Sequence, residues 1–178
     1  MSFEVLHSEV IYRGRAFNVL REAVQLPDGG TVALDVIEHP GSVAIVPVDA
    51  EGNVHFVRQY RHPAREMMLE LPAGTLETGE DPEVCAHREL REEIGMSAGK
   101  MEPLGDFYLA PGYSSEHMYV YLATRLEENP LPGDEDEFLS VEIIPAKKAL
   151  EMLTQGAFKD AKSLAALALA QAKLHAPA

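Results

Sequence analysis

The sequence is poor in several residue types that mark whole classes of protein. It has one cysteine, Cys85, so no disulfide can form within the chain, and a disulfide scaffold or a cysteine zinc site is excluded. Tryptophan is absent, and no apolar run reaches the length of a transmembrane helix. The first ten residues lack the basic and apolar segments of a secretion signal, which predicts a cytoplasmic location and no membrane partner.

Positive charge is also scarce, because 15 Lys and Arg residues face 29 Asp and Glu residues, giving a net charge of −14. A chain this acidic does not bind a phosphate backbone by electrostatic attraction alone, so no nucleic-acid partner is expected. If the protein acts on a phosphate-containing molecule, positive charge must come from outside. A divalent metal is the obvious source, since the surplus carboxylates are ligands for hard cations.

The 178 residues are 46% hydrophobic, which suits one well-packed domain. Turn signals predict two hairpins early in the chain. The first joins residues 15–26 to 31–38 through Pro27-Asp28-Gly29-Gly30, and the second joins residues 42–49 to 54–60. The elements expected further along are strands at 104–109, 116–123 and 141–144 and helices at 146–155 and 159–174.

One helix is expected at about residues 82–94, between these two groups of elements. Asp81 followed by Pro82 is typical of an N-cap with proline at the first helical position, and Gly95 is typical of the left-handed residue just past a helix end. The apolar residues of this segment recur with the period of a helix and predict a buried face.

Three glutamates of this helix, Glu89, Glu92 and Glu93, share an arc that borders the apolar face. Like charges this close repel one another, and Glu89 and Glu93 lie one helical turn apart, where they can hold one Mg²⁺ ion or two neighbouring ions. Taken alone, the same pattern also fits a solvated acidic helix face.

The spacing of residues before the helix separates these two readings. Gly74 is followed after five residues by Glu80, and Glu80 after seven residues by RELREEIGM, residues 88–96. With residue usage of ~7% each, seven identities at fixed spacing have a chance on the order of 10⁻⁸ per start position. The arrangement matches the Nudix box, so the chain resembles the Nudix hydrolase family. This resemblance implies an α/β (α+β) fold, the Nudix α/β/α sandwich with a mixed sheet, plus a small N-terminal antiparallel β subdomain.

The resemblance also implies a metal site with two or three Mg²⁺ ions, for which Mn²⁺ can substitute. Its expected ligands are three carboxylates and one backbone carbonyl: Glu89, Glu92, Glu93 and the carbonyl of Ala73. The residues expected to support the ligands, by tying the preceding loop to the helix, are Gly74, Glu80 and Arg88.

Flanking motifs narrow the resemblance. RQYR at 58–61, ELPAG at 70–74 and APGYSSE at 110–116 are similar to the ADP-ribose pyrophosphatase subfamily. The implied reaction is hydrolysis of ADP-ribose to AMP and ribose 5-phosphate. Another nucleotide sugar such as GDP-mannose is the alternative substrate, because related enzymes share much of this pattern. A nucleotide-binding module without catalysis is the alternative from a different class.

The same resemblance suggests residues for the substrate and for the base. Arg61, Glu70 and Glu116 are expected substrate contacts, although a lone strand arginine is often only a surface residue. The acidic loop GDEDE offers Glu135 as the general base and Glu137 as an accessory ligand. On composition alone this loop also fits a solvated turn.

The expected division of the chain is an N-terminal β region, residues 1–40, and a Nudix hydrolase domain, residues 41–178. A sheet ending at the first forty residues would present unpaired edges. Enzymes that the chain resembles are homodimers whose N-terminal strands cross to the partner, so residues 1–40 are expected to serve dimerisation.

Overall fold

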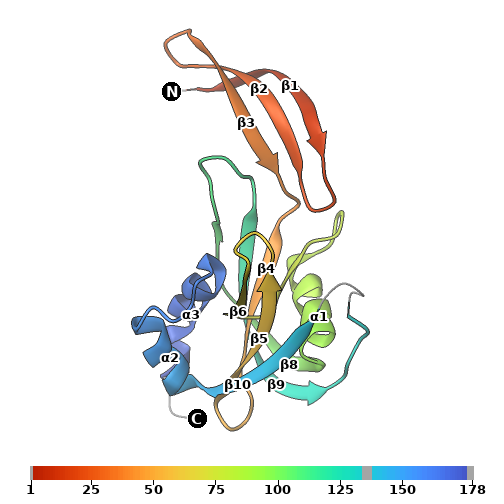
Figure 1. Ribbon diagram of the computed structural model, residues 1–178, viewed down its shortest axis with the longest axis vertical. Helices are drawn as coiled ribbons and strands as arrows, with labels where there is room; N and C mark the ends of the chain where they lie inside the picture. Colours follow the sequence, from red (N-terminus) through yellow and green to blue (C-terminus); the bar gives the residue numbers. More distant parts are fainter. Residues whose placement is uncertain (1, 134–137, 176–178) are drawn as a thin grey trace. The chain divides into compact units, whose positions relative to one another are not determined.

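The computed structural model describes residues 2–133 and 138–175. The chain forms two compact units (Figure 1). The N-terminal unit comprises Met1–Gly41 and Tyr108–His117, and the C-terminal unit comprises Ser42–Phe107 and Met118–Ala178. Each is described by itself below.

The N-terminal unit is an antiparallel sheet in the order β1-β2-β3. Its strands are β1 (Glu4–Arg13), β2 (Asn18–Gln25) and β3 (Thr31–Glu38). The β2–β3 turn contains Gly29 at φ 87°, a conformation that favours glycine, and so the first predicted hairpin is confirmed. The segment 108–117 belongs to this unit because Ile37 bonds through its N–H and its carbonyl to Tyr113 and Ser115.

The C-terminal unit is built around two sheets, ordered β7-β4-β9-β8 and β10-β5-β6. The strands are β4 (Ser42–Pro47), β5 (Asn53–Arg61), β6 (Glu66–Glu70), β7 (Ala73–Thr75), β8 (Met96–Tyr108), β9 (His117–Glu128) and β10 (Leu139–Pro145). Strands β4 and β9 are parallel, whereas β4–β7, β5–β6 and β5–β10 are antiparallel. The second predicted hairpin is wrong as a strand pair, because β4 and β5 lie in different sheets and only an isolated antiparallel bridge, Val48 to Val54, joins the two segments. The sheet arrangement is mixed.

Helices lie on both sides of these strands (Figure 1). Helix α1 (Pro82–Glu93) packs against β4 and β7. Helix α3 (Ala161–Leu174) also packs against β4, and α2 (Ala146–Thr154) packs against β5 and β10. The mixed sheets between helices, together with the N-terminal antiparallel sheet, confirm the predicted fold class. In the described part of the chain, no helix is both long and apolar enough to cross a membrane.

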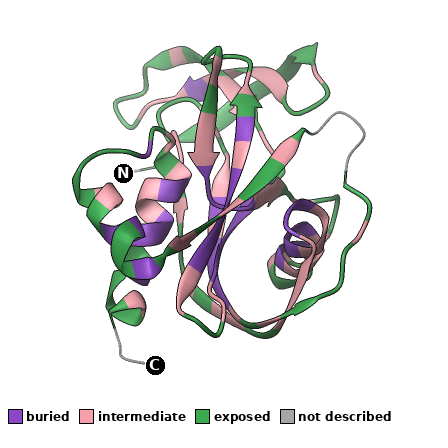
Figure 2. Cartoon of the chain, turned by 60° about the horizontal axis from the view of Figure 1, so that its bottom comes forward, coloured by how far each residue is buried: buried purple, intermediate pink, exposed green. Residues whose placement is uncertain are grey.

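The core of the C-terminal unit lies between α1 and the strands (Figure 2). Every residue of β4 is buried, and Val43 and Ile45 pack with Val57 of β5. Leu90 and Ala86 of α1 close this core from the helix side, as the helical period predicts. Burying such side chains contributes about 1.5–3 kcal/mol each for the larger ones, and it fixes the acidic face of α1 beside the sheet.

Strands β8 and β9 are longer than the predicted strands 104–109 and 116–123. Strand β8 contains Gly99, Pro103 and Gly105, residues that weaken a strand signal, and it is tolerated here as the edge strand of its sheet. Strands β6 and β7 were not predicted, because five and three residues are too few to display a period.

Candidate active site

Helix α1 has well-defined ends, which set the orientation of its glutamates. The Asp81 side chain accepts hydrogen bonds from the N–H groups of Glu83 (2.9 Å) and Val84 (3.4 Å), and Pro82 opens the helix. Gly95, just past the other end, has φ 71°. These features confirm the predicted N-cap and glycine stop, and they hold the helix in one register against the core.

Two of the glutamates are buried against the loop that precedes the helix. Glu89 is 8% exposed and Glu93 is 7% exposed. The backbone N–H of Ala73 donates to Glu93 Oε2 at 2.9 Å. The Glu89 carboxyl group lies so close to Gly74 that a Cβ added there would come within 1.8 Å of its carboxyl carbon. Only glycine at position 74 leaves room for that carboxylate, so the loop and the helix are shaped to each other.

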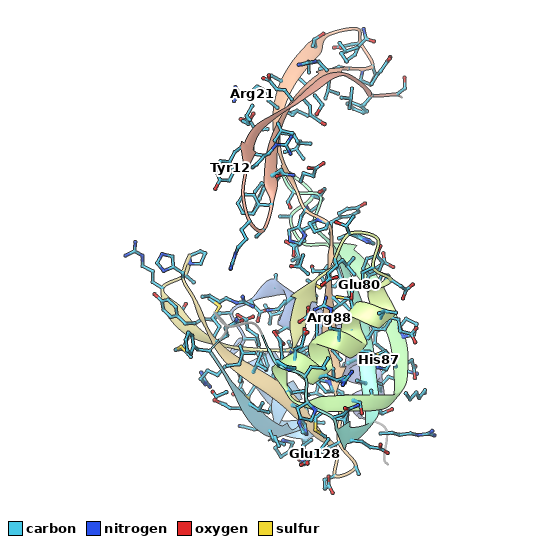
Figure 3. All side chains as sticks on the ribbon, turned by 90° about the vertical axis from the view of Figure 1, so that its right-hand side faces the viewer. Tyr12, Arg21, Glu80, His87, Arg88 and Glu128 are labelled. Atoms are coloured by element: carbon cyan, nitrogen blue, oxygen red, sulfur yellow. The ribbon has the colours of Figure 1, made fainter. Side chains whose placement is uncertain are left out.

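Arg88 ties the loop to the helix, as its place beside Glu80 in Figure 3 illustrates. Its Nε and Nη2 donate to the two Glu80 oxygens, each at 3.0 Å. Its Nη1 donates to Glu89 at 2.6 Å and to Glu92 at 2.9 Å, and Nη2 also reaches the carbonyl of Thr75 at 3.2 Å. The hydrogen bonds from Arg88 lower the pKa of Glu80 to about 2, despite the opposing effect of burial.

Arg61 and Glu70 form a second charged group at the ends of β5 and β6. The guanidinium donates from Nε to Oε1 at 2.9 Å and from Nη2 to Oε2 at 2.7 Å, a bidentate pair. Glu70 is 1% exposed, and its burial alone would raise its pKa. The hydrogen bonds from Arg61 and the charge of Lys162 outweigh burial and lower the pKa of Glu70, so the carboxylate stays ionised.

The donor atoms around α1 fit a hard divalent cation. The Glu93 carboxylate lies beside the backbone of Ala73 and that of Glu89 beside Gly74, while Glu92 shares Arg88 Nη1 with Glu89. Carboxylate oxygens are the ligands that Mg²⁺ prefers. Within residues 2–133 and 138–175, no three His, Cys, Asp or Glu side chains are already grouped around one point to hold a metal. Arg88 donates hydrogen bonds to Glu89 and Glu92 in this structure. To bind a metal ion, these two carboxylates must release the hydrogen bonds from Arg88.

Glu135 and Glu137 lie outside the described residues. Glu116 belongs to the N-terminal unit, where its N–H donates to Ser114 Oγ at 3.2 Å. Cys85 is buried, and burial raises the pKa of its thiol, which fits packing rather than nucleophilic chemistry.

One basic side chain beside the Arg61–Glu70 pair was not predicted from the sequence. Lys162, at the start of α3, contacts the Glu70 carboxylate although ninety-two residues separate them in the chain. No local pattern marks this lysine, because only the packing of α3 against the end of β6 brings it there.

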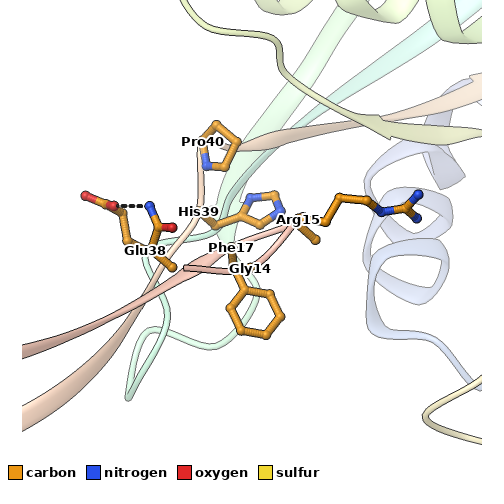
Figure 4. A pocket seen from close by; sticks show the side chains of 8 residues that line it. Gly14, Arg15, Phe17, Glu38, His39 and Pro40 are labelled. Atoms are coloured by element: carbon orange, nitrogen blue, oxygen red, sulfur yellow. Dashed lines mark hydrogen bonds between the residues drawn. The ribbon is translucent and has the colours of Figure 1, made fainter. Parts of the chain in front are cut away.

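The N-terminal unit contains a hollow of about 450 Å³ that the sequence also did not reveal (Figure 4). It is lined by residues 14–18 and 38–40, which lie at the ends of β1, β2 and β3. Asn18 Nδ2 donates to Glu38 Oε2 at 2.9 Å across these strands. Phe17 is 40% exposed here, beside Arg15 and His39, so the hollow combines an aromatic ring with cationic and polar groups.

Comparison with known proteins places this arrangement in a family. Residues 38–167 match the family described as the NUDIX domain, and the chain belongs to that family of hydrolases. It is 37% identical to an ADP-ribose pyrophosphatase of Bacillus subtilis over 172 residues, covering 96% of this chain and 93% of the relative. It is 41% identical to an ADP-ribose pyrophosphatase of Mycobacterium tuberculosis over 157 residues, covering 86% and 76%.

A solved structure of similar fold agrees with this family membership. A crystal structure described as that of an ADP compounds hydrolase superposes with a TM-score of 0.85, at 27% sequence identity. The superposition covers 98% of this chain and 95% of the other.

Proposed function

We propose that the protein hydrolyses the diphosphate of ADP-ribose in a Mg²⁺-dependent reaction, giving AMP and ribose 5-phosphate. The observation that carries the proposal is the pair of buried carboxylates, Glu89 and Glu93, seated against the backbone of residues 73–74. Two buried carboxylates on one helix face form a set of oxygen ligands suited to a divalent cation. The named activity of the two relatives, and of the structural neighbour, agrees with a diphosphate linked to adenosine.

In this proposal Glu89, Glu92 and Glu93 hold two or three Mg²⁺ ions together with the Ala73 carbonyl. When bound, the metal neutralises the diphosphate and makes water a stronger nucleophile; Mn²⁺ can substitute. Arg88 keeps Glu80 and the loop in place, so the ligands are aimed before substrate arrives.

Arg61 is the proposed contact to the substrate's phosphate. Its Nε and Nη2 are held by Glu70, and Nη1 donates to no residue in the described part of the chain. The pKa of Arg61 is raised chiefly by its hydrogen bonds to Glu70, with a smaller contribution from the charge of Glu93. Arg61 therefore lies within electrostatic range of the α1 carboxylates, as a phosphate contact requires.

Glu135 is the proposed general base, with Glu137 as an accessory ligand, and Glu116 is a proposed substrate contact. The reaction is proposed to take place in the cytoplasm.

We also propose that the protein is a homodimer assembled through residues 1–40. Every residue of β1 is exposed, and large apolar side chains are among them. These are Val5, Leu6, Val10, Ile11 and Tyr12, between 38% and 57% exposed. Exposed apolar side chains concentrated on one strand are usual at an interface between subunits.

A substrate panel tests the proposed reaction. ADP-ribose, GDP-mannose, ADP-glucose and NADH are compared by kcat/KM with Mg²⁺, with products identified by chromatography. We expect ADP-ribose to exceed the others at least about tenfold, a difference of about 1.4 kcal/mol in transition-state binding. A larger value for GDP-mannose would replace the substrate, and binding of the whole panel without any product would replace catalysis by a binding module.

A further inference from the structure

The first turn of α3 is joined to the end of β6 by polar contacts. Asp160 caps the helix by accepting from the Ser163 N–H at 2.9 Å. Ser163 is fully buried, and its Oγ accepts from the Leu71 N–H at 2.8 Å. Lys162 donates to the Glu70 carboxylate and, at 3.1 Å, to Asp160 Oδ1. This turn therefore holds Glu70 and Leu71 in place. These two residues directly precede the segment that contacts the α1 carboxylates.

Lys162 is unusually buried for a lysine, with only 12% of its side chain exposed. Lys159 provides a contrast within the same segment. It pairs with Glu66 of the same strand, β6, at 2.5 Å, but its side chain is 61% exposed. An exposed pair of this kind contributes little to stability, whereas removing one partner of a buried pair leaves an uncompensated charge behind.

Lys162 and Arg61 share the carboxylate of Glu70. Glu70 accepts from both cations, and its Oε2 is shared between Arg61 Nη2 and Lys162 Nζ. Lys162 is also paired with Asp160, so its effect on Arg61 is to occupy part of Glu70 Oε2, the oxygen that Arg61 Nη2 also uses. Asp160 also caps the N-terminus of α3, so one carboxylate serves both Lys162 and the helix.

We propose that Lys162 is a positioning residue for the diphosphate of the substrate, acting through Glu70 on Arg61. This inference rests on the proposed function, because it assumes that Arg61 contacts the phosphate. Lys162 keeps the Glu70 carboxylate between two donors, which fixes the direction of the Arg61 fork. Without it, Arg61 would be the sole counter-ion of a buried carboxylate and would bind phosphate less well.

The test compares Lys162→Met with Lys159→Met, which removes the exposed partner of the same strand. For Lys162→Met we expect KM for ADP-ribose to rise about tenfold while kcat stays within about threefold, because Arg61 binds ground state and transition state alike. For Lys159→Met we expect both constants within about twofold of the wild type. Equal KM values for Lys162→Met and the wild type would overturn the proposal.

A double-mutant cycle separates positioning from general support of the fold. If Lys162 acts through Arg61, then Lys162→Met has no further effect on KM in an Arg61→Met background. Additive effects would show that Lys162 acts elsewhere and would overturn the proposal. Thermal unfolding is followed for each variant, and Lys162→Gln, which keeps a hydrogen-bonding side chain of similar length, carries the same cycle should Lys162→Met not fold.

The wild-type rate on ADP-ribose tests the proposed function by itself. If another member of the substrate panel is preferred, the KM comparison is made with that substrate. If the wild type releases no product, binding of ADP-ribose is measured by calorimetry, and weaker binding by Lys162→Met but not by Lys159→Met supports the positioning role. Equal binding by the two variants would contradict it.

Discussion

Strand β1 of the N-terminal unit and β4 of the C-terminal unit are both rich in apolar residues, yet every residue of β1 is exposed and every residue of β4 is buried. The difference comes from what covers the strands. Strand β4 has α1 and α3 packed against it, whereas β1, β2 and β3 form a sheet with no helix of their own. A three-stranded sheet with exposed apolar side chains is stabilised by packing against another surface. The comparison therefore shows that the C-terminal unit forms a core of its own and that the N-terminal sheet leaves apolar side chains uncovered within its own unit.

The two units also differ in the chemical groups that they present. The C-terminal unit holds the buried carboxylates and the arginines that orient them, while the N-terminal unit offers a hollow and an apolar surface. We therefore expect changes in the first to reduce turnover and changes in the second to affect assembly and substrate binding.

The largest effect is expected from Glu93→Gln, which removes a charged ligand and keeps its shape. Turnover of ADP-ribose should fall by about 10³ or more, because the metal carries most of the stabilisation of transition-state charge. Glu83→Gln, an exposed glutamate in the first turn of the same helix, is the control and should stay near the wild-type rate. Equal rates for Glu93→Gln and the wild type at saturating Mg²⁺ would remove the metal assignment.

A smaller loss is expected from Gly74→Ala. The added Cβ would meet the Glu89 carboxyl group, which is the mobile end of a side chain and can swing aside. The fold should survive while the carboxylate loses its direction, so we expect turnover to fall about a hundredfold with little change in the melting temperature. Gly52→Ala, whose Cβ would meet nothing within 4 Å, is a control for alanine in a loop, with some strain expected from its φ of 79°. Unfolding of Gly74→Ala without a specific loss of turnover would contradict this account.

The N-terminal unit is tested by Ile11→Lys, which places a charge on the exposed face of β1. Burying an unpaired charge in an interface costs about 2 kcal/mol or more, so the dimer should weaken by at least about thirtyfold. Ile143→Lys, a change of the same kind on β10 at 56% exposure, is the control. Light scattering gives the mass, and a wild-type mass near 19.5 kDa, that of one chain, would show that no dimer forms.

The smallest effect concerns pH and the Arg88–Glu80 pair. Because the pKa of Glu80 is lowered to about 2 in the folded protein, its contribution to stability is present above its unfolded pKa and is lost as pH falls through the folded value. We expect Glu80→Gln to remove about 1–2 kcal/mol of the stability that the wild type loses between pH 5 and pH 2. Parallel stability curves for the two proteins over this range would exclude the pair as a source of pH dependence.

Sequence reasoning found α1 because its signals are local. The cap at Asp81, the stop at Gly95 and the spacing from Gly74 are read directly from neighbouring residues. Strand β8 was mostly missed, because its glycines and its proline hide a strand that pairs with β9 at the edge of a sheet. The role of Lys162 could not be predicted, since its contact with Glu70 depends on how α3 packs.

The sequences of β1 and β4 differ in charge, because β1 contains Glu4, Glu9 and Arg13 and β4 has no charged residue. The helices that cover β4 come from distant parts of the chain, and no local pattern shows them. The hollow of the N-terminal unit was missed for a related reason, because its lining comes from residues 14–18 and 38–40, which only the pairing of strands brings together.

The central claim is that the carboxylates of α1 hold metal that is required for cleavage of ADP-ribose. The most direct test is release of AMP from ADP-ribose by the wild-type protein, measured with Mg²⁺, after addition of EDTA, and after Mg²⁺ is restored. We expect AMP and ribose 5-phosphate in equal amounts with Mg²⁺, no product above background in EDTA, and full recovery on restoring the metal. Undiminished AMP release in EDTA, or none under any of the three conditions, would contradict the claim.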